Sequence, residues 1–63
     1  MANFVFLIET DGTDRTRRVI ADNPTQAFSI VFNNLQWILE DGEEIMKIEI
    51  IDIDGLPVKI FVD

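Results

Sequence analysis

The chain has 63 residues, 12 of them acidic and 5 basic, so its formal net charge is −7. It contains no cysteine and no histidine, which excludes disulfides, thiolate metal sites and the commonest metal ligand and general base. The charge opposes binding to nucleic acid or anionic membranes and favours basic partners. We expect a single small domain over residues 1–63, soluble and cytoplasmic, with no signal or membrane-spanning segment.

Two strands are predicted at the start of the chain. The first covers Asn3 to Thr10 (NFVFLIET), where aromatic and branched residues predominate. The second, from Arg15 to Ala21 (RTRRVIA), is more polar. Residues 11–14 have the composition of a turn, in which Gly12 is free to take a positive φ.

A helix is predicted from Asn23-Pro24 to a C-terminal cap at Gly42. Proline fits the first helical position because no backbone hydrogen bond is needed there, and Asn23 fits the N-cap. Gln26 stands three residues after Asn23, so its side chain could accept a hydrogen bond from the cap's backbone amide, as in a capping box.

Two more strands are predicted after the helix, the isoleucine-rich Ile45 to Ile53 and the shorter Val58 to Val62, with a turn over residues 54–57. The first and third strands are apolar on both faces, as central strands are, whereas the second and fourth carry charges suited to edges. The sequence predicts an α+β fold in the order β-β-α-β-β. Its four-stranded, mainly antiparallel sheet has the strand order 2-1-3-4, with one helix on one face.

The predicted helix carries more apolar residues than one buried stripe needs. A rotation of about 100° per residue gathers seven of them in one sector that can cover the sheet: Ala27, Phe28, Val31, Phe32, Leu35, Ile38 and Leu39. Ile30 and Trp37 fall outside this sector, on a flank with amide side chains. Either the sheet twists far enough to reach them, or a chain terminus folds over Trp37, or they form a contact patch in which Trp37 anchors a partner.

One helix covers only one face of a sheet. Period-two alternation places Phe4, Phe6 and Ile8 toward the helix. It sends a second apolar set to the uncovered face: Val5, Leu7, Ile20, Ile51, Ile53 and Phe61, within a rim of Arg18, Lys47, Glu49 and Lys59. An apolar centre with a charged rim is typical of an interaction surface. We expect a homodimer or higher oligomer through this face, or a larger protein partner.

Catalytic and metal-binding signals are weak. Ser29 has no histidine, cysteine or tyrosine to activate it, so no nucleophile–base pair can be assembled. Asp52-x-Asp54-Gly55 matches part of a calcium loop but lacks a third oxygen ligand and the closing glutamate. The glycines are isolated, so no phosphate-binding loop is present. We expect a protein that is not an enzyme and holds neither a metal nor a cofactor.

Two clusters of like charge remain. Arg15, Arg17 and Arg18 could serve a nucleic-acid surface or a salt bridge to a partner, although arginines on an edge strand also protect against aggregation. Acidic residues surround the predicted end of the helix, at Glu40, Asp41, Glu43 and Glu44. They are solvated loop residues, or they imitate the phosphates of DNA in an inhibitor of a DNA-binding enzyme.

The junction from the second strand to the helix, "VIADNPTQAFSIVF", resembles a pattern in small acidic phage and mobile-element accessory proteins. It is similar to the host RNA polymerase inhibitors of podophages at Ala21, Asp22, Asn23 and Ala27. This chain departs from that pattern in its strong fourth strand and more apolar helix. The resemblance implies a small non-enzymatic protein that binds a larger host enzyme and acts by occupying its surface.

Overall fold

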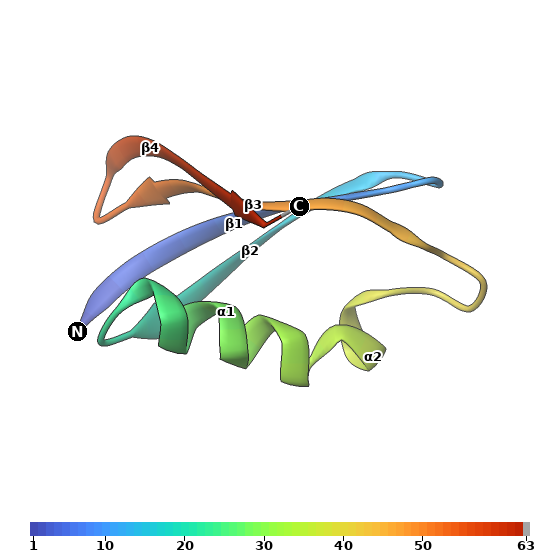
Figure 1. The fold of residues 1–63 in the computed structure, drawn as a ribbon, viewed down its shortest axis with the longest axis horizontal. Coiled ribbons are helices and arrows are strands. Elements are labelled where there is room, and N and C mark those ends of the chain that lie inside the picture. Colours follow the sequence, from blue (N-terminus) through green and yellow to red (C-terminus); the bar gives the residue numbers. More distant parts are fainter. Residues whose placement is uncertain (63) are drawn as a thin grey trace.

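The computed structural model describes the backbone of residues 1–62 and the side chains of residues 1–58. The elements in chain order are β1 (Ala2–Thr10), β2 (Asp14–Ala21), α1 (Pro24–Asn33), α2 (Leu35–Ile38), β3 (Ile45–Ile53) and β4 (Leu56–Val62). All neighbouring strands pair antiparallel, in the order β2-β1-β3-β4 (Figure 1). The predicted α+β class, element order and strand order are therefore confirmed.

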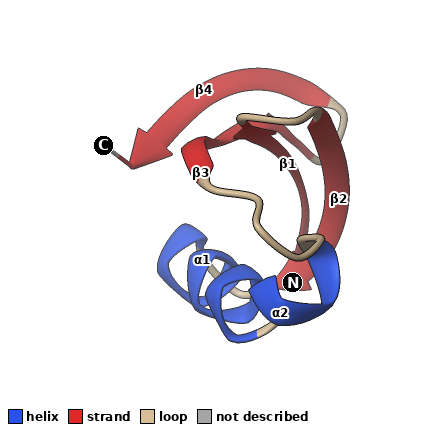
Figure 2. Ribbon diagram, turned by 90° about the vertical axis from the view of Figure 1, so that its right-hand side faces the viewer, coloured by secondary structure: helices blue, strands red, loops and turns tan. Residues whose placement is uncertain are grey.

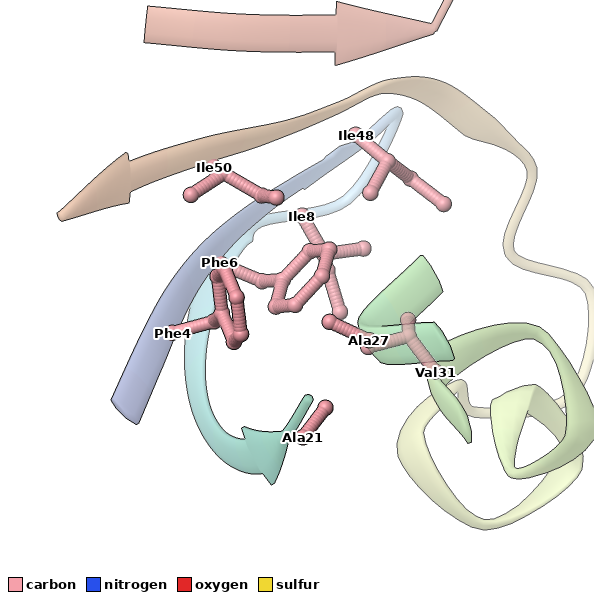
Figure 3. Packing of buried hydrophobic residues seen from close by; sticks show 8 residues of the cluster. All are labelled: Phe4, Phe6, Ile8, Ala21, Ala27, Val31, Ile48 and Ile50. Carbon is pink, nitrogen blue, oxygen red and sulfur yellow. The ribbon is translucent and has the colours of Figure 1, made fainter. Parts of the chain in front are cut away.

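The strands bend into an arch, and both helices lie across its inner, open side (Figure 2). The core fills the space between them. Alternate residues of β1, namely Phe4, Phe6 and Ile8, point inward and are buried. They pack with Ala21, Ala27, Val31, Ile48 and Ile50, as Figure 3 shows. The face of the sheet that points away from the helices is called the outer face below.

The first turn of α1 is capped by side chains. Asn23 has extended backbone geometry, and its Oδ1 accepts a hydrogen bond from the Gln26 amide at 2.8 Å. The Gln26 side chain also accepts a hydrogen bond from a backbone amide. We had predicted the amide of Asn23 as the donor, but the donor is the amide of Asp22, at 2.6 Å. The N-cap prediction is correct, and the reciprocal bond lies one residue earlier in the chain.

The prediction of one continuous helix is wrong. α1 ends at Asn33, and the Asn34 side-chain Nδ2 donates to the Ile30 carbonyl at 2.7 Å. Asn34 thereby competes with the helical backbone pattern, and the chain continues in the single turn α2. Leu39 is already extended, so Gly42 (φ +84°) lies in a turn and does not cap the helix.

The break also changes which helical residues face the core. Ile30 is partly buried and packs against the core, which agrees with the alternative that the core reaches it and not with a contact patch. Phe32, which we had assigned to the stripe, is 44% exposed. Phe28 does reach the core, where its ring meets Phe6 edge-to-face with centroids 5.0 Å apart.

The two hairpin turns differ in backbone conformation. Gly12 does not use the positive φ that is open to glycine, but a Cβ there would lie 3.1 Å from Glu43 Oε2. In the turn between β3 and β4, Asp54 (φ +53°) and Gly55 (φ +85°) are both left-handed. Two central residues of positive φ are what a two-residue type I′ turn requires, and Asp-Gly is a preferred pair.

Candidate protein-binding surfaces

Cross-strand pairing brings residues from all four strands side by side on the outer face. One row joins Arg18 of β2, Val5 of β1, Asp52 of β3 and Pro57 of β4. The next row joins Thr16, Leu7 and Glu49. Residues directly paired in an antiparallel ladder share a face, so each row has an apolar residue in the middle and polar groups beside it.

The apolar part of this face is smaller than the sequence predicted. Val5, Leu7 and Ile51 are half-buried, and Ile20 on the edge strand is 58% exposed. Ile53 pairs with Phe4 and packs against the core, so its assignment to the outer face is wrong. The register shifts between Ile50 and Asp52, and this irregularity breaks the simple alternation on which the prediction depended. The side chain of Phe61 lies outside the described residues.

A hollow of about 690 Å³ opens on the outer face at the end nearest the β3–β4 turn. Its walls combine apolar side chains with a guanidinium and two carboxylates: Val5, Ile51, Pro57, Arg18, Asp52 and Asp54, with Asn3 and Gly55. The carboxylates also hold the turn, because Asp52 Oδ1 accepts from the Gly55 amide and Asp54 Oδ1 from the Asn3 amide, both at 2.8 Å. Among the described side chains, Arg18 has no ion-pair partner.

Glu49 is a feature of the outer face that sequence reasoning missed. We had placed it in a charged rim, but it is only 5% exposed. Lys47 Nζ lies 3.7 Å from Glu49 Oε2, and that oxygen accepts no hydrogen bond from the described residues. The alternation of side chains along β3 correctly predicts the face on which Glu49 lies. It does not predict that the Glu49 carboxylate is buried.

The helical segment exposes two aromatic side chains. Trp37 in α2 is 78% exposed, and Phe32 at the end of α1 is 44% exposed. Phe32 stacks on Phe28 with ring centroids 6.1 Å apart, so its ring is held in place from the core side. The expectation that Trp37 lies outside the buried stripe agrees with its exposure, whereas its companion Ile30 packs inward.

The acidic residues after α2 do not form a uniformly exposed group. The Glu43 side chain is only 10% exposed, and its two oxygens accept hydrogen bonds from Arg15, Thr10 and the Glu40 amide. The contacts with Arg15, and the other hydrogen bonds, lower the pKa of Glu43 to about 2. Glu40, Asp41 and Glu44 are exposed, although Glu40 Oε1 also lies 3.9 Å from Arg15 Nη2.

The arginines of β2 are divided between the two faces of the sheet. Arg15 and Arg17 pair with the inward-facing Ile8 and Phe6, whereas Arg18 pairs with the outward-facing Val5. Arg15 contacts Glu43 at 2.8 Å, and Arg17 Nη1 donates to the Thr16 carbonyl. The three guanidinium groups therefore do not form one basic surface.

No group of three or more potential acidic metal ligands occurs within the described part of the chain. Neither α1 nor α2 has the length and apolar character that a bilayer crossing requires. Comparisons of the chain with protein families, with curated proteins and with solved structures find no match.

Proposed function

We propose that this protein is a non-enzymatic protein-binding module that acts by occupying a surface of a larger protein, with Trp37 as its anchor. The observation that carries the proposal is the exposure of Trp37, a residue that is 78% exposed on a one-turn helix. Tryptophan dominates the binding energy of many interfaces because one rigid side chain buries a large area. Such an anchor fits an apolar pocket of the partner.

Charge supports a partner whose pocket has a basic rim. Glu40 and Asp41 follow Trp37 closely in the chain, and both are exposed. The whole chain carries a net charge of −7, which speeds the approach of a positively charged surface. Inhibition of a host enzyme, as in the phage proteins that the chain resembles, is the role we propose for this binding.

The charges of the described residues give less support to the two rival functions. A DNA mimic presents a series of free carboxylates, but Glu43 is held by Arg15 within the protein. An arginine-based nucleic-acid surface needs its cations on one face, whereas Arg15 and Arg18 lie on opposite faces of the sheet. We therefore favour a protein partner with an apolar pocket over either alternative.

The test combines affinity capture with fluorescence. Trp37→Ala should reduce affinity for the captured partner protein at least about 30-fold, because truncation of an anchor residue costs about 2 kcal/mol or more. Leu56→Ala is the matched control: Leu56 is 69% exposed but lies in β4, away from the helices, and its variant should bind normally. Circular dichroism checks that both variants keep the fold.

The chain contains a single tryptophan, so its emission reports directly on Trp37. Addition of the purified partner should shift the emission to shorter wavelength and protect it from acrylamide quenching, because the indole leaves water. Glu40→Gln combined with Asp41→Asn should weaken binding more at low salt than at high salt. Normal capture by Trp37→Ala, or unchanged emission in the complex, would contradict the proposal.

A further inference from the structure

The two sides of the outer face carry complementary chemistry, with the apolar residues of β1 between them. β2 presents Asp14, Thr16, Arg18 and Ile20, and the other side presents Lys47, Glu49, Asp52 and Asp54. A surface whose two sides carry groups that complement each other, such as opposite charges, can bind a second copy of itself about a two-fold axis. We propose that the outer face binds a second copy of this chain, face to face, about a two-fold axis that runs along β1.

The register of the sheet selects this axis. Arg18 and Asp52 flank Val5 on either side, because both are its cross-strand partners. A half-turn about an axis along β1 exchanges the two sides, so Arg18 of each copy lies opposite Asp52 of the other. A half-turn about an axis across the strands sets Arg18 against its own copy if it passes through Val5, and sets Val5 against Glu9 if it passes through Leu7. Only the axis along β1 joins Arg18 to Asp52 and also brings Val5 onto Val5.

The same rotation places an exposed apolar side chain over the hollow. Ile20 pairs with Asn3, and the Asn3 amide donates to Asp54 on the other side of β1. Ile20 of one copy therefore lies over the part of the hollow next to Asp54 and Gly55 in the other copy. Ile20 is 58% exposed, and Val5, Ile51 and Pro57 supply an apolar lining to receive it. This insertion lets two arched sheets meet closely.

The remaining rows are compatible with this arrangement. Asp14 of one copy lies opposite Lys47 of the other, because both are aligned with Glu9. Glu9 would face its own copy, but it lies near the end of β1. Packed sheets that are aligned cross at about 30°, which separates residues far from the centre of contact. The crossing therefore moves the like charges of Glu9 apart and loosens the contact of Asp14 with Lys47 in the same row, while the central row stays in register.

The solution mass and a charge exchange test this dimer. The wild-type chain should have the mass of a dimer in sedimentation equilibrium. Arg18→Asp and Asp52→Arg should each raise the dissociation constant by about 100-fold or more, because each sets like charges against each other. An equimolar mixture of the two variants should restore the dimer, since both contacts in the mixed pair again join opposite charges.

Further variants distinguish loss of the dimer from loss of the fold. Asp52→Asn keeps the oxygen that accepts from the Gly55 amide and removes only the charge, so it should weaken the dimer without disturbing the turn. Ile20→Asp should dissociate it, whereas Leu56→Asp, at an exposed residue outside the hollow, should not. A wild-type monomer at the highest soluble concentration would overturn the proposal, as would a dimer unaffected by Arg18→Asp and Ile20→Asp.

This inference is independent of the proposed function. Trp37 lies in α2, on the side of the sheet opposite to the outer face, so its emission should be the same in monomer and dimer. Loss of partner binding in Trp37→Ala with an unchanged mass would separate the two surfaces. A failure of one proposal is therefore recognisable without reference to the other.

Discussion

The carboxylate of Glu43 joins three distant parts of the chain. It contacts Arg15 at the start of β2, Thr10 at the end of β1 and the amide of Glu40 in the loop after α2. Its Oε2 also lies 3.1 Å from the position that a Cβ at residue 12 would take, which explains glycine there better than backbone conformation does. The sequence predicts Glu43 as an exposed acid, but its carboxylate connects the loop after α2 to the strands β1 and β2.

This contact predicts a specific dependence of stability on pH. The folded pKa of Glu43, about 2, lies below its ordinary value of 4.5, so ionisation favours the folded state. The stabilisation is complete above pH 4.5 and is lost as the pH falls toward 2. In urea unfolding, Glu43→Gln should be less stable than wild type by a constant amount above pH 5, and the two curves should converge between pH 4.5 and 2.

Glu44→Gln removes the same charge from an exposed neighbour and is the matched control. It should leave the change in stability between pH 4.5 and 2 as in wild type. A difference between wild type and Glu43→Gln that persists at pH 2 would contradict the proposed role of the Glu43 carboxylate.

The elements that depend on residues close together in the sequence could be predicted from the sequence. The alternation of Phe4, Phe6 and Ile8 gives β1 and its inner face, and Asn23-Pro24 gives the start of α1. The end of the helix was not predictable from apolar spacing, because a side-chain bond from Asn34 to the Ile30 carbonyl changes the path of the chain. The position of Ile53 depends on a register shift at Ile51, which alternation cannot detect.

The β3–β4 turn gives a prediction at the scale of one element. Gly55→Ala should lower the free energy of unfolding by about 1 kcal/mol, because alanine is strained at φ +85°. Asp54→Asn is the control, since asparagine tolerates a positive φ and keeps the acceptor for the Asn3 amide. Urea unfolding measures both. Equal stability of Gly55→Ala and wild type would exclude a left-handed residue 55.

At the scale of the molecule, stability depends on a small core. The buried apolar cluster has eight described residues, and Ile50 is among those with no exposed surface. A chain of 63 residues has roughly 3–9 kcal/mol of stability. The free energy lost when a single core side chain is truncated is therefore comparable with the total free energy of unfolding.

Ile50→Ala should cost about 2–5 kcal/mol and leave a large fraction of the chain unfolded at 37 °C, whereas Ile50→Val should cost about 1 kcal/mol and stay folded. Met46→Ala, on the same strand but exposed, is the control and should change stability little. Thermal unfolding followed by circular dichroism distinguishes these outcomes. A folded Ile50→Ala with wild-type stability would show that the core lies elsewhere.

The central position of β1 has a consequence for how the chain folds. β1 forms a local hairpin with β2, but its other neighbour, β3, follows only after both helices have been synthesised. Until β3 arrives, one edge of β1 is open, and Phe4, Phe6 and Ile8 lack their cross-strand partners in β3. Contacts between segments so far apart in sequence form late, because a long loop must close first. The nascent hairpin is therefore the stage at which this small protein is most exposed to aggregation.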